Sequence, residues 1–218
     1  MSDEAPALRY RFPVFLSYRR NDYFDSFFQR VHFHLEGQIT QHLGGEFNPC
    51  EVFRDVKYNG TGSESPFHFA QALAGSAVMV ALIAPLYYGP ESPWTVAEID
   101  HMRWRSGSTK CATPLIFPIL MTDGDLSLLP EDVRKILWTD LGSLADGNLK
   151  QNTRDDAELR SKIRGLAPRI AQAVKSAPAP DRTWSDRAEA TLGPAWQHRD
   201  ASSTSRQQEL LRLGDRVP

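Results

Sequence analysis

Ala77-Val78-Met79-Val80-Ala81-Leu82-Ile83-Ala84 is the longest apolar run in the chain. A run without polar side chains predicts a strand buried on both faces, as in a parallel sheet covered by helices on each side. The run is too short to span a bilayer. After a loop from Pro85, Ser92-Pro93 predicts a helix start, because serine favours the N-cap and proline favours the first helical position.

This predicted helix opens with Pro93-Trp94-Thr95-Val96-Ala97-Glu98-Ile99-Asp100-His101. At about 100° per residue, one stripe collects Trp94, Glu98, His101 and Arg105, and the packing face collects Val96, Ile99 and Met102. The stripe is either a solvated face on which a tryptophan covers a groove, or a functional face. His101 either pairs with Glu98 or is exposed.

Predicted strands and helices also alternate along the rest of the chain. Further strands are predicted at 12–18, 50–53, 114–120 and 135–141, and helices at 22–43, 65–75 and 155–174. The first of these helices has apolar residues mostly three and four apart and is closed by Gly44-Gly45. Strands that alternate with helices favour a parallel sheet. We therefore predict an α/β, flavodoxin-like fold: a five-stranded parallel sheet, order 2-1-3-4-5, with helices on both faces.

Composition excludes several classes of function. The net charge is −2, which gives no electrostatic reason to expect nucleic acid or an anionic membrane as a partner. Cys50 and Cys111 are far apart and form no CxxC pair, which argues against a disulfide scaffold or a zinc site and fits a cytoplasmic protein. The first eight residues lack the apolar core of a secretory signal. His32 and His34 diverge on a helix, so no metal site is predicted.

The composition changes after residue 176. Ala177-Pro178-Ala179-Pro180-Asp181 has the composition of a linker, and the remainder is mostly polar. Trp184, Trp196 and a short helical run at 207–213 interrupt it. We therefore expect one domain over 1–176 and a largely disordered or loosely docked tail over 177–218.

A ligand site is expected where the sheet's strand order reverses, beyond the carboxyl ends of the strands. The segments that meet there are 17–22, 54–65 and 85–98. Trp94 and Glu98 would then line the same cleft as Tyr18, Arg19 and Arg20. A carboxylate beside an aromatic ring in such a cleft is a candidate catalytic group. Gly60 and Gly62 form either an anion-binding nest or a plain turn.

Three segments together resemble the TIR (Toll/interleukin-1 receptor) domain family, in particular its bacterial NAD-cleaving branch. Val14-Phe15-Leu16-Ser17-Tyr18-Arg19-Arg20-Asn21-Asp22 is similar to the first-strand box and the loop after it. Val52-Phe53-Arg54-Asp55 is similar to the strand that enters the BB loop. Trp94-Thr95-Val96-Ala97-Glu98 has the Trp-x-x-x-Glu spacing of the enzymatic members. The resemblance covers Val14 to Val174.

The resemblance implies an NAD⁺ glycohydrolase or ADP-ribosyl cyclase with Glu98 as the catalytic residue. Cleavage of the nicotinamide–ribose bond passes through an oxocarbenium-like state that one carboxylate can stabilise. Substrate contacts are expected from Ser17, Tyr18, Arg19, Arg20, Phe53, Arg54, Asp55 and Trp94. Arg20 is equally compatible with a structural role. NAD⁺ is then the substrate, and no metal or further cofactor is needed.

The chain also departs from the family pattern. Pro-Gly does not follow Arg54-Asp55, and Leu137-Trp138 is the nearest match to the Phe-Trp box of animal adaptors. The resemblance points to bacterial antiviral defence or signalling, with activity that depends on self-association through TIR–TIR contacts and with a partner protein downstream. Two alternatives stay open. One is a non-enzymatic TIR–TIR interaction module, and the other is a different flavodoxin-like enzyme of the deoxyribosyltransferase type.

Overall fold

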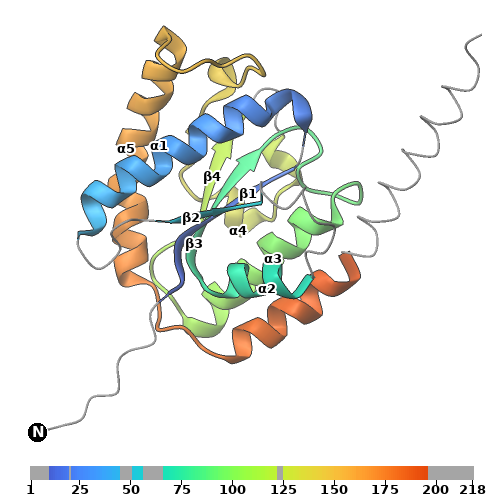
Figure 1. Cartoon of the computed structure of the whole chain (residues 1–218). Coiled ribbons are helices and arrows are strands. Elements are labelled where there is room, and N and C mark those ends of the chain that lie inside the picture. Colours follow the sequence, from blue (N-terminus) through green and yellow to red (C-terminus); the bar gives the residue numbers. More distant parts are fainter. Residues whose placement is uncertain (1–9, 20, 45–50, 56–65, 122–124, 196–218) are drawn as a thin grey trace, which may run out of the picture.

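The computed structural model describes residues 10–19, 21–44, 51–55, 66–121 and 125–195. These residues contain a parallel five-stranded sheet with the order β2-β1-β3-β4-β5 (Figure 1). The strands are β1 (Phe12–Tyr18), β2 (Val52–Arg54), β3 (Ser76–Ile83), β4 (Ile116–Leu120) and β5 (Thr139–Asp140). The predicted flavodoxin-like α/β fold and its strand order are confirmed.

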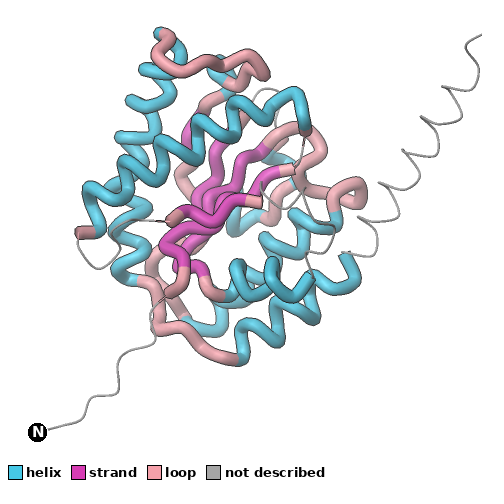
Figure 2. The backbone as a smooth tube through the Cα atoms, viewed as in Figure 1, coloured by secondary structure: helices cyan, strands magenta, loops and turns pink. Residues whose placement is uncertain are grey.

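The apolar run lies at the centre of the sheet. Every residue of β3 is buried, and the strand pairs with β1 on one side and with β4 on the other. Figure 2 shows the strands as a central layer between helices. A strand in this position has no face in contact with water, which explains why its sequence does not alternate between apolar and polar residues.

Helices cover both faces of the sheet. Figure 1 shows α1 (Asp25–Leu43) and α5 (Arg154–Ser176) on one face, and α2 (Pro66–Ala74) and α3 (Pro93–Thr109) on the other. The short α4 (Glu131–Arg134) precedes β5, and 3₁₀ turns occupy Asp22–Phe24, Leu126–Leu128 and Gly142–Leu144. None of the helices in the described ranges could cross a membrane, given their length and polarity.

Most element boundaries agree with the prediction within a few residues, but β5 does not. A strand is predicted over 135–141, and only Thr139 and Asp140 pair with β4. Lys135 instead ends α4, where its N–H donates to Glu131 O. Gly44 lies at the C-cap of α1 with a φ of 79°, a conformation that favours glycine. Gly45 and Cys50 lie outside the described residues.

Part of the segment after residue 176, for which a largely disordered or loosely docked tail is expected, is helical and has a buried face. Residues 183–195 form a helix, seen in red-orange beside α3 in Figure 1. Its buried face consists of Trp184, Ala188, Leu192 and Ala195. The Trp184 ring lies 4.2 Å from the Arg105 guanidinium, and Tyr10 O–H donates to Pro178 O at 2.5 Å. Trp196 and the run at 207–213 lie outside the described residues.

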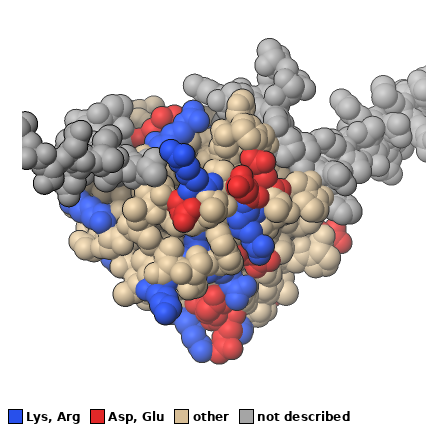
Figure 3. Space-filling model, turned by 90° about the horizontal axis from the view of Figure 1, so that it is seen from below, with Lys and Arg blue, Asp and Glu red and all other residues tan. Residues whose placement is uncertain are grey.

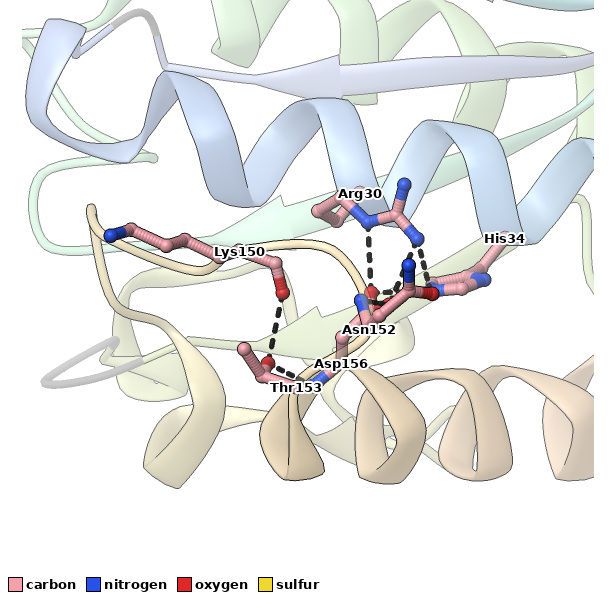
Figure 4. A network of polar contacts seen from close by, with 6 residues as sticks. All are labelled: Arg30, His34, Lys150, Asn152, Thr153 and Asp156. Atoms are coloured by element: carbon pink, nitrogen blue, oxygen red, sulfur yellow. Dashed lines mark hydrogen bonds and ion pairs between the residues drawn. The ribbon is translucent and has the colours of Figure 1, made fainter.

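A partly buried ion pair joins α1 to α5 (Figure 4). Arg30 Nε and Nη2 donate to the two carboxylate oxygens of Asp156 at 2.8 and 3.0 Å, and His34 Nε2 lies 2.8 Å from Oδ1. The Thr153 hydroxyl caps the helix by accepting from Asp156 N–H. Desolvation raises the pKa of Asp156, but the bonds from Arg30 and His34 outweigh it and hold this pKa at about 2.

The first prediction concerns this ion pair. Because the pKa of Asp156 is lowered by folding, its contribution to stability is present above pH 4 and disappears as the pH falls through about 2. We expect Asp156→Asn to lower the free energy of unfolding at pH 7 by roughly 2 kcal/mol. Urea unfolding at pH 7, 4 and 2.5 measures the difference, which should shrink at the lowest pH.

Asp155→Asn is the matched control, since Asp155 lies on the same helical turn and is exposed. It removes a similar charge near the helix N-terminus without touching Arg30. A loss for Asp156→Asn that is the same at pH 7 and pH 2.5, or that the control reproduces, would contradict the ionic contribution.

The second prediction tests the docked C-terminal helix. Trp184 is 4% exposed and stacks on Tyr10 at 6.4 Å between ring centroids. We expect Trp184→Ala to lower the free energy of unfolding by about 3 kcal/mol, because a buried aromatic ring and its cation–π contact are lost. Denaturant unfolding measures this value. The control is Arg182→Ala, at an exposed position two residues earlier, which should change the free energy of unfolding by less than about 0.5 kcal/mol. Equal losses in the two variants would show that the helix is not firmly docked.

Candidate functional site

The register of the sheet brings the strand ends together at one edge. Ser17 and Tyr18 of β1 pair with Ala81 and Leu82 of β3. Nearby, β2 ends opposite Leu16 and β4 ends opposite Ile83. The strand order reverses between β1 and β3, so this is the edge where ligands bind in open α/β sheets. Because α3 follows β3, it starts at this edge, and Trp94 and Glu98 lie near it.

Successive residues of a strand point to opposite faces, and this separates the predicted site residues into two groups. Phe15 contacts Phe69 of α2, and Ser17 contacts Glu98 of α3. Tyr18 instead packs on Phe28 of α1, with 4.4 Å between ring centroids. Tyr18 therefore lies on the other face of the sheet and does not line a common surface with Glu98.

Glu98 is held inside the protein by hydroxyl groups. Its side chain is buried, with the residue 2% exposed, and Ser17 Oγ donates to Glu98 Oε2. The same Ser17 oxygen lies 2.5 Å from the hydroxyl of Tyr87, which is also buried. Three residues from β1, from the loop after β3 and from α3 therefore meet at one point, although they are far apart in the sequence.

Tyr87 is not among the residues that the sequence motifs predict. Its neighbour Leu86 has a φ of 59°, which turns the chain sharply after β3. Two hydroxyl groups at the start of α3 bind the backbone of this turn. Ser92 Oγ donates to Leu86 O, and Thr95 Oγ1 donates to Tyr87 O. Ser92 is at the predicted N-cap, but its hydroxyl holds this loop and does not cap the helix. A hydroxyl-bearing residue in the loop that follows the central strand is the signal that could have identified Tyr87.

Burial also sets the protonation of Tyr87. Desolvation raises the pKa of Tyr87 well above 10, and the nearby Glu98 raises it further. Tyr87 is therefore a neutral hydrogen-bond donor at physiological pH.

A row of aromatic rings connects β2 to α3 on the same face of the sheet. Phe53 stacks on Phe15 at 5.1 Å and meets Phe69 at 5.5 Å, and Phe69 meets the half-buried Trp94 at 4.7 Å. The structure thus places Phe53 and Trp94 on the Glu98 face, joined through Phe69. Both rings also pack against the hydrophobic core.

The remaining predicted residues form a second group around Tyr18. Its hydroxyl donates to Asp55 O at 2.7 Å, and Arg54 Nη2 donates to Asp25 at 2.7 Å. The Arg54 guanidinium also lies 5.8 Å from the Tyr18 ring centre. Arg54 is therefore used in an ion pair between β2 and α1. Arg19 is half-buried next to this group, whereas Arg20, Gly60 and Gly62 lie outside the described residues.

The predicted functional stripe on α3 does not extend to His101 and Arg105. Both are buried, and His101 pairs with no partner for either ring nitrogen among the described residues. Arg105 donates to Ser76 O and Ala77 O, at the start of β3, and its guanidinium lies over Trp184. Arg105 therefore lies at the edge of the sheet away from Glu98. The helix at 183–195 covers this part of α3, which explains why neither side chain is presented to a ligand.

The distribution of charged side chains and of metal-binding side chains limits what else the molecule could bind. On the face in Figure 3, basic and acidic side chains are interspersed, and neither sign forms an extended patch there. Within the described ranges, no cluster of three His, Cys, Asp or Glu side chains could hold a metal ion. Among the described residues on the Glu98 face, the groups near this edge are a carboxylate, hydroxyls and aromatic rings.

Neither protein-family models nor curated proteins give a match to this chain.

The third prediction follows from the burial of His101. Desolvation, with the Arg105 and Arg187 charges adding to it, lowers the pKa of His101 to about 3. An unfolded chain takes up this proton below about pH 6.5, so the folded state loses stability relative to it as the pH falls from 6.5 towards 3. Denaturant unfolding at pH 7 and at pH 4.5 gives the free energy of unfolding at each pH. The decrease between the two should be smaller in His101→Phe than in the wild type by roughly 2 kcal/mol.

His68→Phe is the control, since His68 is exposed on α2. It makes the same replacement at an exposed position and should leave the difference in stability between pH 7 and pH 4.5 as it is in the wild type. If the free energy of unfolding depended on pH in the same way in wild type and His101→Phe, protonation of His101 would not destabilise the folded state.

Proposed function

We propose that this chain is a TIR-type NAD⁺ glycohydrolase or ADP-ribosyl cyclase in which Glu98 is the catalytic residue. The observation that carries the proposal is a buried carboxylate at the carboxyl edge of the sheet, beside the reversal of strand order, held by a hydroxyl of β1. The Trp-x-x-x-Glu spacing supports the same assignment, because Trp94 lies in the first turn of the helix that carries Glu98. The two side chains lie one helical turn apart.

The proposed reaction breaks the bond between nicotinamide and the ribose C1′. Nicotinamide leaves with the bonding electron pair as a neutral molecule, so no strong general acid is needed. Positive charge develops on the ribose, and the Glu98 carboxylate stabilises it. Water then adds at C1′ and loses a proton to give ADP-ribose, or a nucleophile within the same molecule adds to give a cyclic product.

The remaining residues have supporting roles in the proposal. Trp94 and Phe53, on the Glu98 face, would contact rings of the dinucleotide. Arg19, near the tip of β1, and Arg20 would contact phosphate or ribose oxygens. Tyr18, Arg54 and Asp55 lie on or next to the other face, so we assign them to shaping the segment that follows β2.

We further propose that the enzyme acts in the bacterial cytoplasm, in antiviral defence or signalling, and becomes active on self-association. The resemblance to TIR enzymes supports this part, since there the BB loop of a neighbouring subunit helps to complete the site. A downstream partner protein fits the same interpretation. No metal or cofactor is assigned, and NAD⁺ is the substrate.

A non-enzymatic interaction module is the second candidate. Exposed apolar side chains favour it: Leu137 and Trp138, directly before the edge strand β5, are 69% and 39% exposed. Side chains of this kind are common at protein–protein contacts. They are equally compatible with an enzyme that must assemble, so activity decides between the two.

The fourth prediction tests the enzyme directly. Concentrated or crowded protein is incubated with NAD⁺, and nicotinamide release is followed by chromatography. We expect Glu98→Gln and Glu98→Ala to lower the rate on the order of 100-fold or more, because a preorganised charge at the reacting centre is lost. Glu91→Gln is the matched control, since Glu91 is exposed in the loop before α3, and it should keep the wild-type rate.

Wild type that releases no more nicotinamide than the Glu98 variants would contradict the enzyme and leave the interaction module. Nucleosides supplied in place of NAD⁺ test the deoxyribosyltransferase alternative. The mass of the product distinguishes linear ADP-ribose from a cyclic form.

A further inference from the structure

The contacts of Glu98 with hydroxyl groups carry an inference beyond the catalytic carboxylate. Ser17, Tyr87 and Glu98 are each buried, and Ser17 Oγ lies between the other two side chains. The three residues come from separate elements, so the fold and not local sequence brings them together. The Ser17 and Tyr87 hydroxyls are both engaged in hydrogen bonds within this group, so we assign them to the carboxylate and not to a substrate.

The chemistry of the groups fixes the direction of the hydrogen bonds. An ionised carboxylate only accepts, so Ser17 must use its single proton to donate to Glu98 Oε2. Ser17 Oγ can then only accept from Tyr87, which lies 2.5 Å away. The chain of donors therefore runs from Tyr87 through Ser17 to Glu98. Burial, followed by the charge of Glu98, raises the pKa of Tyr87, so Tyr87 keeps the proton that this direction requires.

The backbone around Tyr87 is tied to the helix that carries Glu98. Thr95, in the first turn of α3, donates its hydroxyl proton to Tyr87 O, and Ser92 donates to Leu86 O. The phenol and the carboxylate thus keep a fixed spacing, and Ser17 bridges them from β1. Ser17 in turn pairs with Ala81 in the central strand.

We infer that Ser17 and Tyr87 are positioning residues that orient the Glu98 carboxylate and stabilise its ionised form through a directed chain of two hydroxyl groups. This inference rests on the proposed function for its catalytic consequence, but not for the hydrogen-bond chain itself. It also changes the role expected for Ser17, which supports the carboxylate and does not bind substrate.

Two titratable side chains of the described residues belong to the surroundings of Glu98. Tyr87 faces it across Ser17 from the loop, β1 contributes the neutral Ser17, and the buried His101 lies one turn further along α3. His101 is neutral, since burial lowers its pKa to about 3. Because a hydrogen bond to the ionised carboxylate lowers its pKa, loss of a hydroxyl from the chain should appear as a higher pKa of Glu98.

The test is Tyr87→Phe, which removes one hydroxyl and keeps the ring. We expect kcat for nicotinamide release to fall roughly 5- to 10-fold with KM changed less than about twofold, the size expected for one hydrogen bond acting through another. Ser17→Ala should lower kcat more, roughly 10- to 100-fold, because its bond to the charged group is direct. Tyr88→Phe, one residue away and next to Asp100, should leave kcat unchanged.

A second measurement does not depend on activity. The carboxyl carbon of Glu98 is followed by ¹³C NMR against pH in wild type, Tyr87→Phe and Tyr88→Phe, with assignment from Glu98→Gln, and melting temperatures confirm folding. We expect a higher Glu98 pKa in Tyr87→Phe only. A titration identical to wild type, or a KM effect that exceeds the kcat effect, would overturn the inference. If wild type cleaves no NAD⁺, the proposed function fails and the titration alone decides on the hydroxyl chain.

Discussion

The pairing of β1 with β3 is the constraint on which the candidate site depends. With Ser17 opposite Ala81, the serine points to the α3 face and Tyr18 to the α1 face. A shift of one residue would exchange the two faces and place a tyrosine in the space that Glu98 fills. The shift is excluded because both strands are buried over almost their whole length, so that every side chain would have to be repacked.

Glu98 shows what this register makes possible. A carboxylate that is 2% exposed is costly to bury unless its oxygens accept hydrogen bonds. Ser17 provides one such bond from the strand, and the protein uses a second hydroxyl, that of Tyr87, to orient the serine. A merely structural acid could be replaced by an apolar residue of similar volume at little cost. A group of hydroxyls assembled around one carboxylate is therefore better explained by a need for that charge at that place.

Much of the fold could be predicted from the sequence, and the site only in part. Uniform apolarity identified the central strand, and the alternation of strands and helices identified the parallel sheet. Period-two alternation could also have shown that Ser17 and Tyr18 face opposite ways. Helical angles, by contrast, could not show that His101 and Arg105 are covered, since that depends on a distant helix at 183–195. That helix was hidden by a polar composition, although Trp184, Ala188, Leu192 and Ala195 follow helical spacing.

Three polar residues on α3 are buried in three different ways. The Glu98 carboxyl group accepts from the Ser17 hydroxyl, His101 is neutral, and Arg105 donates to carbonyls at the start of β3 and lies over the ring of Trp184. The guanidinium thus lies between the central strand and the C-terminal helix and connects both to α3. Since a helix is stiff along its axis, fixing its C-terminal half against β3 also restricts where its first turns can lie. Through Arg105 and Trp184, the C-terminal helix therefore helps to fix the helix that carries Glu98.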